Sequence, residues 1–190
     1  LEQIIVVEGY MDVVMLAQYD IRNVVATLGT ATTPEHLTRL FRDVPDLIFC
    51  FDGDDAGRKA AWRALENVLP LLQDGRQVSF VFLPQGEDPD TLVRKAGAAG
   101  FKHYLSQAIP LSAYLFETLT PQVNLKTTEG QAKLKELATP LLAQLPTSSY
   151  RDLMFQQLSE LTHINPQELT KFIPKNPISQ PTVVKKPKPL

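Results

Sequence analysis

The sequence predicts an α/β protein: a mostly parallel four-stranded sheet flanked by helices, followed by a small all-helical subdomain. Short continuous apolar runs alternate with helical patterns through residues 1–108, as in parallel sheets that helices cover on both faces. Three of the four runs end in acidic residues. Beyond residue 108, helical patterns follow one another without a strand between them. We therefore expect domains at 1–108 and 109–174, and a linker at 175–190.

The four expected strands are residues 3–7, 23–27, 47–51 and 77–83, with helices between them at 10–19, 34–42, 59–72 and 90–96. Thr33 and Pro34 give the second helix its clear start, because a threonine N-cap followed by proline is a common helix beginning. His36 lies in that first turn without a cysteine or second histidine at metal-ligand spacing. We therefore expect a solvated histidine.

The expected helical subdomain consists of residues 110–119, 128–145, 148–161 and 166–172, whose apolar stripes predict packing faces. Pro140 lies inside the longest of these helices and is expected to kink or split it. From Lys175 onward, prolines alternate with lysines. This composition is typical of a linker or a disordered tail.

Charge and cysteine content restrict the function. The 190 residues carry a formal net charge of −2, which argues against simple binding of a phosphate backbone, so contact with nucleic acid would need metal-bridged contacts or another basic surface. Cys50 is the single cysteine, so no internal disulfide can form, and a buried core thiol is expected. No apolar run is long enough to span a membrane and no signal-peptide pattern is present, so a cytosolic protein is the default. The start at Leu1 without methionine suggests a piece of a longer protein.

The acidic residues at the strand ends are the candidate functional site. Asp52, Gly53 and Asp54 directly follow one expected strand, and Glu8 follows another. In an open α/β sheet the carboxyl edge of the strands is where ligands bind, and Gly53 allows the turn that brings both aspartates together. Two carboxylates held together repel unless a cation lies between them, and Mg²⁺ prefers such oxygen ligands. A helix N-cap would explain Asp54 or Asp55, but not Asp52.

Further acidic residues are expected near this edge. Asp12, one helical turn after Glu8, is explained equally by the helix dipole, and Asp88, which precedes Pro89, by helix capping. Asp90 follows in the same loop.

Four motifs together resemble a known family. Glu8 with the Asp-Gly-Asp turn matches the Toprim domain, the metal-binding module of primases, topoisomerases and some nucleases. Glu-Gly-Tyr-Met-Asp (8–12), Thr-Leu-Gly-Thr (27–30), Phe-Asp-Gly-Asp-x-Ala-Gly (51–57) and Gly-Glu-Asp-Pro-Asp-Thr-Leu (86–92) resemble the bacterial replicative DNA primases of the DnaG type. Pro-Leu-Ser-Ala-Tyr-Leu-Phe (110–116) is similar to the segment that follows Toprim in that family.

The resemblance implies that residues 1–108 are a Toprim catalytic domain and 109–174 a helical subdomain, together the C-terminal part of a DNA-directed RNA polymerase core. It implies primer synthesis from ribonucleoside triphosphates on single-stranded DNA in the bacterial cytoplasm, with no membrane partner. Zinc is expected only in the absent N-terminal domain, and the replicative helicase is expected to bind through an absent C-terminal domain.

The resemblance also implies roles for individual residues. Glu8, Asp52 and Asp54 would be the catalytic ligands of Mg²⁺, or of Mn²⁺. Asp12, Asp88 and Asp90 would form an outer ring of acids. Gly29 and Thr30 would approach the triphosphate, although a plain turn explains both equally well.

Three other functions use similar residues. A Toprim nuclease would employ the same acids to activate water. A non-catalytic module would bind a metal-nucleotide or an alarmone. A phospho-acceptor receiver domain carries aspartates at strand ends, but has no role for Glu8 followed by the Asp-Gly-Asp turn.

Overall fold

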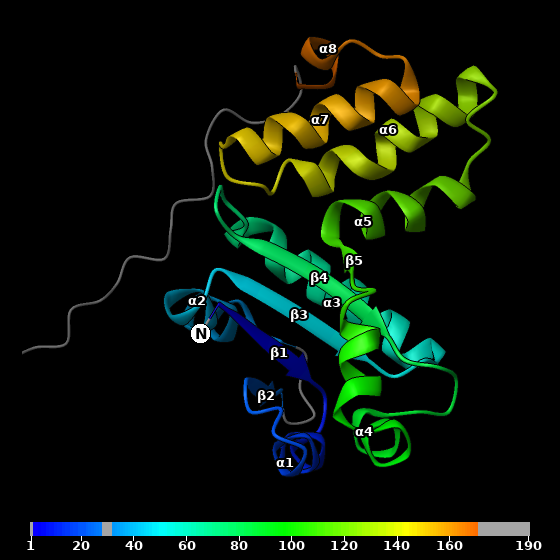
Figure 1. The fold of residues 1–190 in the computed structure, drawn as a ribbon. Helices are drawn as coiled ribbons and strands as arrows, with labels where there is room; N and C mark the ends of the chain where they lie inside the picture. Colours follow the sequence, from blue (N-terminus) through cyan, green and yellow to red (C-terminus); the bar gives the residue numbers. More distant parts are fainter. Residues whose placement is uncertain (1, 28–31, 171–190) are drawn as a thin grey trace, which may run out of the picture.

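The computed structural model describes residues 2–27 and 32–170. Its centre is one five-stranded sheet in the order β2-β1-β3-β4-β5 (Figure 1). The strands are β1 (Gln3–Val7), β2 (Val24–Ala26), β3 (Asp46–Phe51), β4 (Gln77–Phe82) and β5 (Ile109–Pro110). β1 to β4 are mutually parallel, and β5 pairs antiparallel with β4. The mostly parallel α/β fold is therefore confirmed.

The expected number of strands was one too low. β5 has only two residues, Ile109 and Pro110, which pair with Phe80 and Ser79. Two residues are too short for a periodic pattern, so the sequence did not reveal this strand.

Helices cover both faces of the sheet. α1 (Tyr10–Gln18) and α4 (Pro89–Leu105) lie on one face, and α2 (Pro34–Asp43) and α3 (Asp55–Val68) on the other. The short 3₁₀ helix η1 (Leu69–Leu71) continues α3. Alternate β1 residues enter opposite cores: Ile5 contributes to the α1–α4 side and Ile4 to the α2–α3 side. Burial on both sides explains the continuous apolar runs.

The remaining helices are α5 (Leu111–Leu119), the 3₁₀ turn η2 (Thr120–Gln122), α6 (Thr128–Leu142), α7 (Ser149–Thr162) and α8 (Pro166–Thr170). Of the two effects expected at Pro140, a split is wrong, because α6 continues through the proline to Leu142. A kink there stays a prediction. The break lies instead in α4, where Gly97 has a φ of 68°. Glycine adopts this left-handed conformation without the steric cost that other residues carry.

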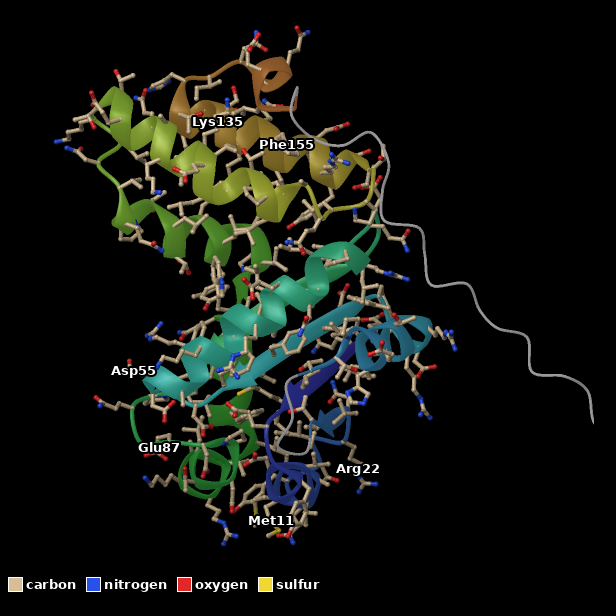
Figure 2. All side chains as sticks on the ribbon, turned by 180° about the vertical axis from the view of Figure 1, so that it is seen from behind. Met11, Arg22, Asp55, Glu87, Lys135 and Phe155 are labelled. Carbon is tan, nitrogen blue, oxygen red and sulfur yellow. The ribbon has the colours of Figure 1, made fainter. Side chains whose placement is uncertain are left out.

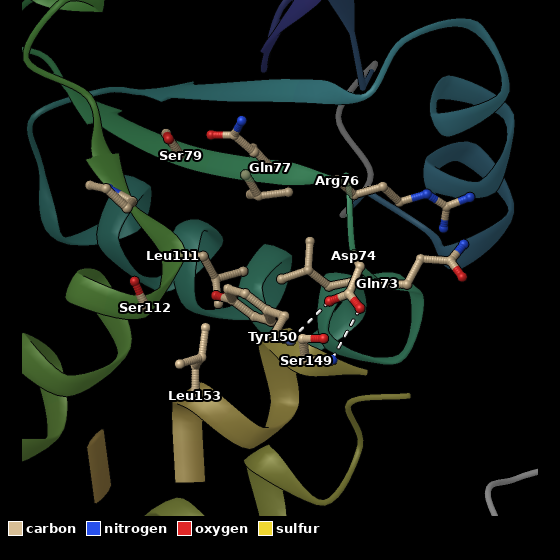
Figure 3. A pocket seen from close by; sticks show the side chains of 14 residues that line it. Gln73, Asp74, Arg76, Gln77, Ser79, Leu111, Ser112, Ser149, Tyr150 and Leu153 are labelled. Carbon is tan, nitrogen blue, oxygen red and sulfur yellow. Dashed lines mark hydrogen bonds between the residues drawn. The ribbon is translucent and has the colours of Figure 1, made fainter. Parts of the chain in front are cut away.

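The helical segment packs directly onto the sheet. The Tyr114 ring on α5 lies 4.7 Å from that of Phe80 and 5.4 Å from that of Phe82, between ring centroids. Asp74, which precedes β4, connects the sheet to α7. Its two carboxylate oxygens accept hydrogen bonds from the backbone N–H groups of Ser149 (3.1 Å) and Tyr150 (2.9 Å). A shallow pocket opens beside this contact (Figure 3). One hydrophobic core thus extends from the sheet into α5, α6 and α7.

Two residues behave as their sequence context predicted. Cys50 is 1% exposed, and burial raises the pKa of its thiol. His36 is exposed, and its backbone N–H donates to the Thr33 hydroxyl that caps α2. Within residues 2–27 and 32–170, no helix has the length and apolar character needed to cross a membrane.

Candidate functional site

Two of the predicted acids lie on adjacent strands at the same edge of the sheet. Glu8 follows β1 and Asp52 follows β3, and these strands are parallel neighbours with Val6 opposite Phe49. Continuing this register places Glu8 opposite Phe51, one residue before Asp52. Residues more than forty positions apart are therefore neighbours at the carboxyl edge, where α/β proteins bind ligands.

The turn after β3 is packed so closely that it requires glycine. A Cβ atom on Gly53 would lie 2.0 Å from the carbonyl oxygen of Leu83, at the exit of β4. A Cβ atom on Gly57 would lie 2.2 Å from the carbonyl oxygen of Asp52. Asp54 is the N-cap of α3, and its Oδ1 accepts a hydrogen bond of 2.7 Å from the backbone N–H of Gly57. These contacts hold both aspartates at the start of the helix.

The edge has an excess of negative charge. Burial, followed by repulsion from Glu8 and the other nearby acids, raises the pKa of Asp52 to about 6. Burial raises the pKa of Glu8 as well, with repulsion from Asp54 and Asp12, while the backbone N–H of Asp52 acts in the opposite direction. The carboxylates therefore lie close enough to oppose each other's ionisation.

The three secondary acids come to the same edge but already have partners. Asp12 accepts from the backbone N–H groups of Gly9 (3.0 Å) and Asp90 (3.3 Å), which joins α1 to α4. Asp88 caps α4 by accepting from the backbone N–H of Thr91 at 2.7 Å, and Asp90 forms an ion pair with Arg94. Helix capping thus accounts for Asp88, as the sequence allowed. Gly29 and Thr30 lie outside the described residues.

The donor set suits a hard divalent cation. In the described part of the chain, no three histidine, cysteine or acidic side chains are arranged so that they would hold an ion as they stand. The primary acids nevertheless supply only carboxylate oxygens, which Mg²⁺ prefers. Burial, and after it repulsion from nearby acids, raises the pKa values of Glu8 and Asp52, and a cation bound between these two carboxylates would favour their ionised forms.

Arg58 is a cation at this edge for which the sequence predicted no role. The Arg58 guanidinium carbon lies 5.0 Å from the centroid of the Phe82 ring. The backbone carbonyl oxygen of Arg58 accepts a hydrogen bond of 3.4 Å from the Tyr114 hydroxyl. Arg58 follows the Asp-Gly-Asp turn by one helical turn, and that proximity is the only sequence signal for it.

Comparison with known proteins identifies the family. A sequence model of the Toprim domain matches residues 2–82, and a model of the DnaB-helicase binding domain of primase matches residues 112–167. The DNA primase of Pseudomonas aeruginosa is 55% identical over 178 residues, which are 93% of this chain and 27% of that protein. The DNA primase of Escherichia coli K12 is 53% identical over 174 residues, covering 91% of this chain and 30% of that protein. The chain belongs to the DnaG-type DNA primase family.

Solved primase structures share the fold. A primase domain from Pseudomonas aeruginosa superposes with a TM-score of 0.87 at 57% identity, covering 89% of this chain and 53% of that one. A structure of the DnaG catalytic core gives 0.85 at 52% identity, with 89% and 55% coverage. The chain thus spans about half of these solved primase structures and less than a third of the complete primases.

The two family models differ from the expected organisation in two respects. The helicase contact was expected in a domain outside this chain. The model that is named for helicase binding instead matches residues 112–167, from the start of α5 to α8. Asp88 and Asp90, in turn, lie beyond the residues that the Toprim model matches.

The raised pKa of Asp52 predicts a pH dependence of stability in metal-free protein. A raised pKa in the folded state means that stability from Asp52 is fully present below the unfolded value of 3.8 and is lost as the pH rises through about 6. Asp52→Asn should therefore be more stable than the wild type near pH 7.5, by no more than about 1–2 kcal/mol after discounting for solvent screening. Urea denaturation near pH 4 and pH 7.5 measures this. A variant less stable than the wild type at the higher pH would contradict the electrostatic argument.

Proposed function

We propose that this chain supplies the metal-binding part of a primase active site, which joins ribonucleotides on a single-stranded DNA template. The observation that carries the proposal is the position of Glu8, Asp52 and Asp54 at one edge of a Toprim sheet. The raised pKa values of Glu8 and Asp52, which come from burial and from repulsion by neighbouring acids, support this grouping. The identity of more than half over nearly the whole chain supports the same reaction.

In this mechanism the acids at the carboxyl edge would hold divalent cations. Glu8 and Asp52, at the ends of adjacent strands, would be direct ligands, and so would Asp54, whose Oδ1 also caps α3. Bound divalent cations would stabilise the attacking 3′-oxygen and the leaving pyrophosphate. Asp12 fixes the start of α1 and the start of α4 relative to each other through its two hydrogen bonds, and so positions Glu8. The Gly53 turn keeps Asp52 in place against β4.

The proposed substrates are ribonucleoside triphosphates and a single-stranded DNA template, and the product is an RNA primer. A solved structure of a DnaG primase catalytic domain bound to single-stranded DNA superposes on this chain with a TM-score of 0.84 at 52% identity. Mg²⁺ is the proposed cofactor, with Mn²⁺ as a substitute, and the bacterial cytoplasm is the proposed location. We retain residues 1–108 as the proposed catalytic domain and 109–174 as its helical companion.

The replicative helicase is the proposed protein partner. Its contact is expected in a C-terminal domain, and the match at residues 112–167 adds a second candidate surface inside this chain. Measuring helicase retention by the complete primase, with and without the C-terminal domain, separates the two surfaces.

Primer synthesis by the complete primase tests the proposed activity. Single-stranded DNA, the four ribonucleoside triphosphates and Mg²⁺ should yield short RNA products, and a chelator should abolish them. Metal-dependent cleavage of the DNA without templated synthesis would instead identify a Toprim nuclease. Binding of a metal-nucleotide without either reaction would identify a non-catalytic module.

A further inference from the structure

The carboxyl edge of the sheet carries acids and, beside the Asp-Gly-Asp turn, one arginine that contacts an aromatic ring. On the side covered by α1 and α4 lie the acids Asp12, Asp88 and Asp90. On the side covered by α3 and α5 lies Arg58, whose guanidinium lies over the Phe82 ring and whose backbone carbonyl oxygen accepts a hydrogen bond from the Tyr114 hydroxyl. The Asp-Gly-Asp turn lies between these two sides, and Figure 2 shows Asp55 and Glu87 at this end of the molecule. A substrate that bound metal ions through the acids and presented a further phosphate to Arg58 would therefore have a defined orientation at this edge.

Arg58 differs from two cations near the start of α4, Arg94 and Lys95, in that it is not paired with a carboxylate of residues 2–27 or 32–170. On α4, Arg94 pairs with Asp90, and Lys95 pairs with Glu87. Arg58 is exposed and, among the described residues, has no carboxylate within ion-pair distance. In the part of the chain that the structure describes, the Arg58 guanidinium makes a cation–π contact with the Phe82 ring. The guanidinium N–H donors are thus free to bind an anion.

The aromatic contact gives the guanidinium a fixed position. Stacking on a ring uses the face of the planar group and leaves its edge, with the N–H donors, accessible. The Phe82 ring is itself packed between two others: its centroid lies 6.1 Å from that of Phe51 in a stacked arrangement and 5.4 Å from that of Tyr114 in a tilted one. An arginine held in this way loses less conformational entropy on binding than a free surface lysine.

We propose that Arg58 binds a phosphodiester group of a nucleic-acid strand beside the metal-binding acids. This inference rests on the proposed function, and assigns the α3–α5 side of the edge to the nucleic-acid strand, whereas the acids take the metal-bound triphosphate. Planar guanidinium groups bind phosphate oxygens through paired, charge-assisted hydrogen bonds. Arg58 follows Asp54 by one helical turn, and its backbone N–H donates to the Asp54 carbonyl oxygen at 3.1 Å. A strand that ends at the metal ions would therefore pass over Arg58.

Two strands offer the same chemistry: the DNA template and the growing RNA primer. Binding of labelled single-stranded DNA and of an RNA–DNA duplex by the complete primase, in metal-free buffer, distinguishes them. We expect Arg58→Ala to weaken the affinity for at least one of these about tenfold. The slope of log affinity against log salt should fall by about one. Arg58→Gln, which keeps a planar side chain without charge, should behave similarly, and Arg58→Lys should lose less.

Arg63→Ala is the matched control. Arg63 lies on the same helix, is exposed, and makes no aromatic contact in the described part of the chain. It should bind both nucleic acids like the wild type. Weakened binding of single-stranded DNA alone assigns Arg58 to the template, and weakened binding of the duplex alone assigns it to the primer. Equal affinities for Arg58→Ala, Arg63→Ala and the wild type would overturn the inference.

Kinetics separate this inference from the proposed function. If Arg58 contacts the strand, Arg58→Ala should raise the template concentration at half-maximal primer synthesis about tenfold and change the maximal rate far less. A wild-type primase that makes no primers refutes the proposed function, but leaves the metal-free binding result to decide the role of Arg58.

Discussion

Asp52→Asn in the complete primase is expected to reduce primer synthesis by about 10³-fold or more. Burial, together with repulsion from Glu8, Asp12, Asp88 and Asp54, raises the pKa of Asp52 to about 6. Removing its charge takes away a direct cation ligand, and with it the stabilisation of charge that develops in the transition state. A primer-synthesis assay at saturating Mg²⁺ measures the loss, and circular dichroism checks that the fold is retained.

Asp46→Asn is the control for this experiment. Asp46 begins the same strand, β3, so it lies at the opposite edge of the sheet from Asp52. The same change of charge there should leave primer synthesis near the wild-type rate. Substantial activity in Asp52→Asn, or an equal loss in Asp46→Asn, would show that the carboxyl edge is not the metal-binding centre.

Gly53→Ala is expected to damage both stability and activity. A Cβ atom there would lie 2.0 Å from the Leu83 carbonyl oxygen and 2.6 Å from the Pro84 carbonyl carbon, both of them backbone atoms. Because no flexible side chain can move aside, either the turn or the exit of β4 must shift. We expect a loss of about 2–4 kcal/mol in the free energy of unfolding. Primer synthesis should fall as well, because Asp52 and Asp54 flank the displaced residue. Urea denaturation and the same primer assay measure the two losses.

Gly86→Ala separates steric overlap from backbone strain. Gly86 has a φ of 81°, but a Cβ atom there would meet nothing within 4 Å. It should cost only the strain of a left-handed residue, about 1–2 kcal/mol. If Gly53→Ala were no more damaging than Gly86→Ala, the close packing of the turn would not be what holds the acids.

Buried parallel strands were the most predictable part of the fold. Ile4 and Ile5 enter opposite cores, so β1 reads as a continuous apolar run that a surface strand could not carry. The same argument placed Glu8 and Asp52 at one edge, because parallel strands end on the same side. The preference of threonine and aspartate for helix N-caps likewise predicted that Thr33 caps α2 and Asp88 caps α4.

Features that depend on tertiary contacts were not predictable. α3 begins at Asp55, four residues earlier than expected, because the Asp54 cap and the close approach of Gly57 continue the helix up to the turn. α4 continues beyond the expected residue 96, with the break at Gly97 inside it. Arg58 contacts Phe82, which lies 24 positions further along the chain, and no local sequence pattern predicts that contact.

The continuous core between the sheet and the helices restricts where the chain can be cut into stable pieces or recombined with another protein. Tyr114 covers Phe80 and Phe82, so the sheet without α5 would expose aromatic rings to water. Recombination that joined this Toprim sheet to an unrelated partner would have to supply a replacement for that covering surface. The transferable unit is therefore the sheet together with the first helix that follows it.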